Sequence, residues 1–178
     1  MANNFSKKEV IRVTPTLTGV TYANNDILFT TTEIPNAVEG NGGCSILTSA
    51  MISSKSNSIF DIELFFAETS QSVGTVNAER NVSDSDWASC KVLGRISLDG
   101  SADNYNYGGG RIYNFDRQSD AFDGGTVLRE RWDPRLPIML QASSDSTSVY
   151  CFAFLTGTDV TPDFSVGDIE LILGIDKS

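Results

Sequence analysis

The sequence predicts an all-β fold, an antiparallel β-sandwich that is jelly-roll-like, with one short helix and a long Gly/Asp/Tyr-rich loop. Short runs of alternating apolar and polar residues recur along the chain, and turn-forming residues separate them. Hydrophobic residues make up 40% of the 178 residues and charged residues 20%, which is ordinary for a globular domain. A chain of this length can bury its own core as one domain.

The first half of the chain contains four expected strands. The alternation is clearest in 58–66, where every second residue is apolar and would face a core. We expect 44–54 to be the hairpin partner of this strand, because the polar link 55–57 between them is short. The four expected strands are 10–14, 26–31, 44–54 and 58–66.

The stretch 83–92 differs from the strands and predicts the one short helix. Ser83 is suited to the N-cap, and Asp84 and Asp86 place negative charge in the first turn. Trp87 and the residues after it continue at helical spacing. We expect this helix to lie across the open end of the sandwich.

The second half of the chain adds five expected strands, which brings the total to nine. The run 147–155 is apolar on both faces, which predicts a central strand or one that faces a neighbouring subunit. Regular spacing of short strands with turn signals between them is typical of a sandwich or jelly roll. The five strands are 94–98, 111–115, 136–142, 147–155 and 168–175.

The domain organisation predicted is an N-terminal arm of residues 1–12 followed by a single sandwich domain of residues 13–178. The arm carries Lys7, Lys8 and Arg12 against Glu9, a net charge of +2, whereas the whole chain carries −10. One interpretation is a frayed, solubilising terminus. The other is that Lys7, Lys8 and Arg12 belong to a short arm that docks on an acidic neighbouring surface.

Several residue types that enzymes need are missing from this sequence. There is no histidine, which removes the commonest general base and zinc ligand. The three cysteines, Cys44, Cys90 and Cys151, are far apart and form no Cys-x-x-Cys pair. We therefore expect no enzyme activity and no cofactor, and we expect Cys44 and Cys151 to be small core residues.

Nucleic acid and membrane are also unexpected as partners. A net charge of −10 repels the phosphate backbone. No run of about 18 apolar residues suggests a membrane-spanning helix, and residues 1–8 do not resemble a signal peptide.

Two groups of carboxylates are candidate functional sites. Asp116, Asp120 and Asp123 before a Gly-Gly pair suggest calcium, but the spacing is looser than in an EF-hand, so a solvated acidic loop is favoured and no metal is predicted. Glycosidase chemistry needs only two carboxylates. Glu63, Glu130 and Asp133 are candidates, but nothing in their spacing brings them together.

The segment 99–125 reads as a long loop excursion around the strand 111–115, rich in glycine, aspartate and aromatic residues. Tyr105, Tyr107 and Tyr113 are candidate ligand residues, because aromatic faces stack on sugar rings and provide contact area. The alternative is that these side chains fold back onto the sandwich.

The segment 128–135 combines three arginines and a tryptophan, residue types that are enriched in interface hot spots. Arg129, Arg131, Trp132 and Arg135 are therefore candidates for a subunit interface. Arginine forms bidentate bonds with carboxylates, which an acidic neighbouring copy would supply. The alternative is an intrachain clamp ahead of the strand 136–142.

Residues 13–46 read VTPTLTGVTYANNDILFTTTEIPNAVEGNGGCSI. This stretch resembles small structural proteins of tailed bacteriophages, most of all capsid decoration (cement) proteins, and the likeness extends over residues 13–66. It implies a virion protein on the capsid surface, assembled in the bacterial host cytoplasm, with the major capsid protein as its partner. Lys7, Lys8 and Arg12 would then be the capsid contacts. It also implies a homotrimer that stabilises the head by bridging capsomers.

Two alternatives remain at this point. The chain is suited to a carbohydrate-binding or receptor-binding (head-fibre) domain of a virion, which would use the aromatic residues of 105–115. A minor head or tail component is the second alternative.

Overall fold

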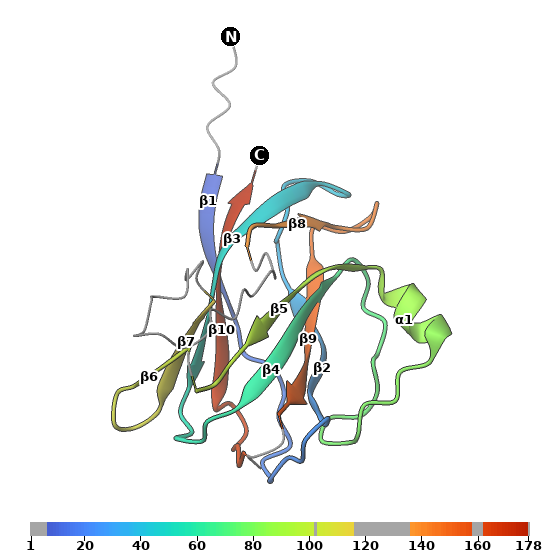
Figure 1. Cartoon of the computed structure of the whole chain (residues 1–178). Helices are drawn as coiled ribbons and strands as arrows, with labels where there is room; N and C mark the ends of the chain where they lie inside the picture. The colour runs from blue at the N-terminus through green and yellow to red at the C-terminus, as the bar shows by residue number, and fades with distance from the viewer. Residues whose placement is uncertain (1–6, 102, 116–135, 158–161, 178) are drawn as a thin grey trace, which may run out of the picture.

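The computed structural model describes residues 7–101, 103–115, 136–157 and 162–177. Its strands pack face to face as two antiparallel sheets (Figure 1), so the predicted all-β sandwich is confirmed. The elements are β1 (Lys7–Val13), β2 (Ile27–Ile34), β3 (Cys44–Ser54), β4 (Asp61–Ala67), α1 (Asp84–Cys90), β5 (Val92–Leu98), β6 (Asn104–Asn106), β7 (Arg111–Phe115), β8 (Ile138–Gln141), β9 (Val149–Thr156) and β10 (Ile169–Lys177).

Within the described residues, one sheet has six strands and the other has four. The six-stranded sheet runs in the order β1-β10-β3-β7-β6, and β8 also pairs with β3. The four-stranded sheet runs β2-β9-β4-β5. The short strand β6 was not expected from the sequence, because Asn104–Asn106 is only three residues long and lies in a glycine-rich and aspartate-rich stretch.

The strand pairing follows the plan of a jelly roll. The pairs β1–β10, β2–β9, β3–β7 and β4–β5 are the successive steps of one long hairpin whose tip lies between β4 and β5. Rolling this hairpin brings β10 against β3 and β9 against β4, which divides the strands between two sheets. The strands β6 and β8 are additions to this plan at the six-stranded sheet.

The expected hairpin between 44–54 and 58–66 is wrong. The strand β3 pairs with β10, β7 and β8, whereas β4 pairs with β5 and β9. The segment 55–60 therefore crosses from one sheet to the other. A short polar link serves such a crossing as well as it serves a hairpin turn, and sequence alternation does not reveal which partner a strand takes.

The core lies between the two sheets and is built by alternation along each strand. In β4 the side chains of Ile62, Leu64 and Phe66 face inward, and in β10 every second residue from Ile169 to Ile175 is buried. The strand β3 keeps this pattern only through a bulge: opposite the step from Gly174 to Ile175 of β10, β3 passes from Ser49 to Leu47.

The strand β9 lies centrally in the four-stranded sheet, between β2 and β4, as its two apolar faces predicted. Its outward residues Phe152 and Phe154 are buried under the segment that links β4 to β5. Phe65, Phe152 and Phe154 form a second apolar cluster there, with Val73 and Cys90 from the covering segment. This sheet is thus covered on both sides by its own chain.

The predicted helix is present, but its position was predicted wrongly. Ser83 caps α1, and its hydroxyl accepts a hydrogen bond from the Asp86 backbone at 3.1 Å. Trp87 packs edge-on against Phe65 and Phe152, with ring centroids 5.3 and 6.1 Å apart. The helix therefore lies on the outer face of the four-stranded sheet and not across the end of the sandwich (Figure 1).

The structure also bears on three further expectations, which concern the domain boundary, the 99–125 excursion and the cysteines. The boundary expected after residue 12 falls inside β1, which pairs along its whole length with β10. The excursion expected over 99–125 contains the β6–β7 hairpin, which extends the six-stranded sheet; residues 116–125 lie outside the described part of the chain. Cys151 is a buried core residue as expected, but Cys44 is exposed.

Candidate binding face on the six-stranded sheet

The outer face of the six-stranded sheet carries apolar side chains where a solvated face would carry polar ones. Val10 of β1 is 63% exposed, Met139 of β8 67% and Tyr105 of β6 68%. We call this surface, formed by the outward side chains of β1, β10, β3, β7, β6 and β8, the open face. Its apolar members are Val10, Ile46, Met51, Tyr105, Ile112, Met139 and Ile172.

Strand register places these residues on one side of the sheet. Directly opposed residues of antiparallel strands share a face. Ile172 is opposite Met51, and Ile46 is opposite Met139. Tyr105 is opposite Ile112, which neighbours the inward-facing Tyr113 and therefore points outward. The apolar residues thus extend across the sheet from β1 to β6.

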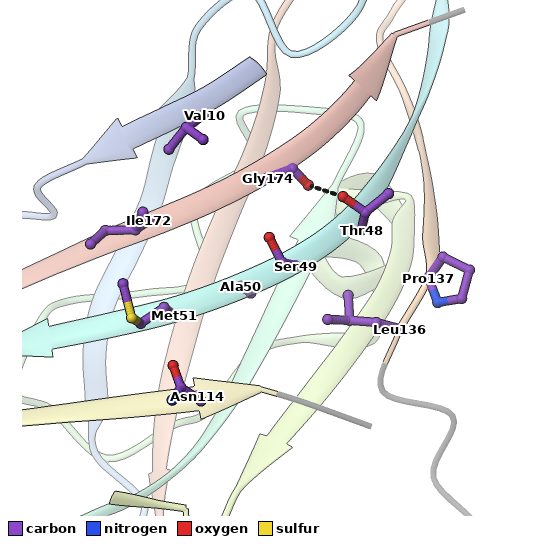
Figure 2. Close-up of a pocket in the computed structure, with 10 residues that line it drawn as sticks. All are labelled: Val10, Thr48, Ser49, Ala50, Met51, Asn114, Leu136, Pro137, Ile172 and Gly174. Atoms are coloured by element: carbon purple, nitrogen blue, oxygen red, sulfur yellow. Dashed lines mark hydrogen bonds between the residues drawn. The ribbon is translucent and has the colours of Figure 1, made fainter. Parts of the chain in front are cut away.

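A groove of about 740 Å³ lies in the middle of the open face (Figure 2). Gly174 forms part of its floor, and Val10, Ile172 and Met51 stand around it. The Thr48 hydroxyl donates to the carbonyl oxygen of Gly174 at 3.0 Å. A Cβ on residue 174 would collide with the Ser49 hydroxyl, so the Ser49 side chain would have to rotate to accommodate it.

The bulge also shapes the open face chemically. Because β3 gains one residue there, Thr48 and Ser49 are both exposed, while Leu47 and Ala50 on either side face the core. Asn114 of β7 also lines the groove, together with Leu136 and Pro137, which precede β8. The groove therefore has apolar walls and a few hydroxyl and amide groups in its floor.

The charged side chains of the open face balance one another. Lys8 and Arg12 lie on β1, and Glu170 and Asp176 lie on β10. The Arg12 guanidinium donates to the Glu170 carboxylate at 2.7 Å. The described part of this face is therefore electrically neutral, in a chain whose net charge is −10.

The structure separates the three basic residues that were proposed as capsid contacts. Lys8 and Arg12 point to the open face, whereas Lys7 lies on the other side of β1 with Glu9. Glu9 also accepts a hydrogen bond from Lys177 at 2.6 Å, and the Lys177 side chain is only 4% exposed. The hydrogen bond from Lys177 and its charge lower the pKa of Glu9.

The three candidate ligand tyrosines occupy different environments. Tyr105 is on the open face. Tyr107 lies in the β6–β7 turn and donates its hydroxyl proton to the Ser54 carbonyl at 3.2 Å. Tyr113 is fully buried against Phe60 and donates to the Ser58 carbonyl at 2.9 Å, and burial raises its pKa. Tyr113 is thus a core residue and cannot meet a ligand at the surface.

The remaining candidates give no reactive centre in the described part of the chain. Glu63 is held by Arg95 at 2.5 Å and Arg80 at 3.6 Å on the outer face of the four-stranded sheet. No group of three metal-ligating side chains occurs among the described residues. The predicted interface residues Arg129, Arg131, Trp132 and Arg135 lie outside the described residues, as do Asp116, Asp120, Asp123, Glu130 and Asp133.

The residues that carry the phage resemblance have structural roles in this fold. Leu17, Tyr22 and Ile34 are buried in the main core. Asn25 and Asn36 adopt positive φ angles of 68° and 53°, which asparagine tolerates better than most residues. The stretch 13–46 therefore specifies turns and core contacts of the sandwich.

Comparison of the chain with protein-family models, with curated proteins and with solved structures finds no match. Within the described residues, no helix is long and apolar enough to span a membrane. The functional argument must therefore come from the open face and from the sequence.

Sequence reasoning missed the open face as a site, although a signal for it was present. In the strands 44–54 and 168–175, the positions between core residues hold Ile46, Met51 and Ile172, where polar residues would suit water. Each is a single apolar residue in a polar position. Only the strand order shows that they are neighbours.

Proposed function

We propose that this protein is a bacteriophage capsid decoration protein, which binds the outside of the assembled head and stabilises it by bridging capsomers. The observation that carries the proposal is the open face, a contiguous set of exposed apolar side chains on a rigid sheet. Such patches on folded domains mark contact surfaces for proteins. A decoration protein acts through contacts of this kind and needs no catalytic group.

The fold and the sequence support this proposal in different ways. Jelly rolls are common in viral capsid domains and in lectins, and a fold alone does not choose between functions. The resemblance of residues 13–66 to phage structural proteins favours the virion. The major capsid protein would be the partner, and the protein would act as a homotrimer on the capsid surface.

The proposed mechanism is physical. Packed DNA presses outward on the head, and contacts that bridge neighbouring capsomers must break before the shell opens. Many copies with modest individual affinity are sufficient, because simultaneous contacts multiply in strength. A net charge of −10 keeps decorated particles apart.

The test is co-sedimentation of the purified protein with heads assembled from the major capsid protein of the same phage. We expect saturable binding and a higher temperature of head disruption when the protein is bound. Saturation at a few copies per head would identify a minor component instead. Absence of binding to intact heads would overturn the proposal.

A variant series tests the predicted capsid contacts in the same assay. Deleting residues 1–8 removes Lys7 and Lys8 but keeps Glu9, the partner of the buried Lys177. We expect weaker attachment with the fold intact, and Lys8→Glu should show the same direction. Lys55→Glu is the matched control, since Lys55 follows the opposite end of β3. Equal occupancy for the deletion and the full chain would exclude these residues as capsid contacts.

The alternative, a carbohydrate-binding or receptor-binding head-fibre domain, has one observation in its favour. Tyr105 is exposed on the open face, where an aromatic ring is free to stack on a sugar. Calorimetric titration with purified host surface polysaccharide distinguishes the two functions. Binding that Tyr105→Ala abolishes would favour the alternative.

A further inference from the structure

We infer that the open face is a contact surface for a second copy of this chain. The inference does not rest on the virion proposal, because it concerns association of the free protein. If both hold, the apolar residues of the open face join the copies, and the capsid is contacted through the β1 edge, where Lys8 and Arg12 lie. Three observations support a second copy as the partner that covers this face: the area of the face, its charge and the path of the chain.

The area of the open face is sufficient for a specific interface. Its strands β1, β10, β3, β7, β6 and β8 contain 39 residues in total, and at about 3.3 Å rise per residue and about 4.8 Å between strands they cover about 600 Å². Two such faces bury about 1,200 Å² in total, which is the lower end of the range for specific protein contacts. Val10, Ile172 and Met51 lie around the groove, and the charged residues Lys8, Arg12, Glu170 and Asp176 lie on β1 and β10.

The charges on the open face favour a copy of the same chain over other partners. Two copies that each carry −10 repel one another over most orientations. On the open face, Lys8 and Arg12 balance Glu170 and Asp176, so two copies can approach there without net repulsion.

The path of the chain points to the same surface. The segment that contains Arg129, Arg131, Trp132 and Arg135 begins after β7 and ends at Leu136. Asn114 of β7 and Leu136 both line the groove. Between these two points of the chain lie the residues whose composition predicts a subunit interface.

The experiment measures the native mass of the full-length protein by light scattering across a range of concentrations. We expect a mass of at least twice 19.3 kDa, at a whole-number multiple of the chain mass. Met139→Glu and Val10→Glu place an unpaired charge on the open face, and we expect each to raise the dissociation constant about 100-fold. Val166→Glu is the matched control, because Val166 is 72% exposed and lies outside the face. It should keep the native mass.

Two results would overturn the inference. One is a monomeric wild-type protein at every concentration. The other is an oligomer whose mass Met139→Glu and Val10→Glu leave unchanged, which would locate the contact elsewhere. Circular dichroism of each variant checks that the sheet is intact, so that a lost oligomer is not confused with a lost fold.

Oxidation of Met139 by hydrogen peroxide identifies the occupant. If a second copy covers the face, Met139 oxidises more slowly in the oligomer than in the monomeric Val10→Glu variant. A monomer with a protected Met139 would show that the chain covers this face itself. A monomer with a reactive Met139 would leave the face to a different protein, and both of these results contradict the inference.

Discussion

The outer faces of the two sheets differ although both carry large apolar side chains. The four-stranded sheet presents Phe65, Phe152 and Phe154, and the segment between β4 and β5 buries them. The six-stranded sheet presents Val10 and Met139, and no described segment covers these side chains. An apolar outer face therefore does not by itself indicate a binding site, because another segment of the same chain can cover it.

The largest expected effect on stability comes from replacing one large apolar residue on each outer face by alanine. Phe152→Ala removes a fully buried ring that contacts Phe65, Trp87 and Phe154. We expect a loss of about 3–5 kcal/mol in the free energy of unfolding, measured by urea denaturation. Met139→Ala on the open face should change it by less than about 0.5 kcal/mol in the monomeric Val10→Glu background. Equal losses would show that the open face is also buried within one chain.

A smaller effect is expected from the cap of the covering helix. Ser83→Ala removes the hydroxyl that accepts the Asp86 backbone proton, and we expect a loss of about 1 kcal/mol. The control Ser83→Asp should retain most of the stability, since aspartate also caps helices. If the covering segment is a necessary part of the fold, Ser83→Ala should lower the denaturation midpoint without altering the slope. An unchanged midpoint would show that the segment between β4 and β5 keeps its place without the Ser83 helix cap.

The smallest effect concerns the edge strand of the uncovered sheet. The pKa of Glu9 is lowered from its usual 4.5 by the hydrogen bond and charge of Lys177. The stability that this pair contributes is therefore present above about pH 4.5 and is lost as the pH falls through the lower pKa of the folded protein. Unfolding free energies measured between pH 7 and pH 3 should fall less steeply for Glu9→Gln than for the wild type.

Glu170→Gln provides the control for that series. It removes an ion pair with Arg12 on the same two strands, but both side chains are well exposed, and such pairs contribute little. We expect its pH dependence to follow the wild type closely. A Glu9→Gln curve parallel to both would contradict a stabilising role for the Lys177 contact.

The sequence predicted most of the strands, because apolar residues alternate where a core lies on one side. The bounds of β3 and β7 were predicted to the residue, and Ser83 was identified as the helix cap. The partners of the strands were not predictable. A link such as 55–57 has the same composition whether the next strand pairs with β3 or crosses to the other sheet.

The residues of the candidate site were likewise predictable only in part. Lys8, Arg12 and Tyr105 were singled out for their chemistry, and the structure brings these three onto one face. Tyr113 was singled out with them, yet it is buried, since its place in the alternation of β7 depends on which neighbours that short strand has. Met139 and Val10 were not predictable as surface residues, because each lies beside apolar residues of the same strand, and only the structure shows which of them face outward.

The rolled hairpin also determines how the molecule can be extended. The first and last strands, β1 and β10, run side by side, with Lys7 opposite Lys177 and Glu9 joining them. A peptide or reporter domain attached ahead of β1 and one attached behind β10 would leave from the same end of the sandwich. A short linker between the two would allow circular permutation, with new termini opened in the turn between β6 and β7.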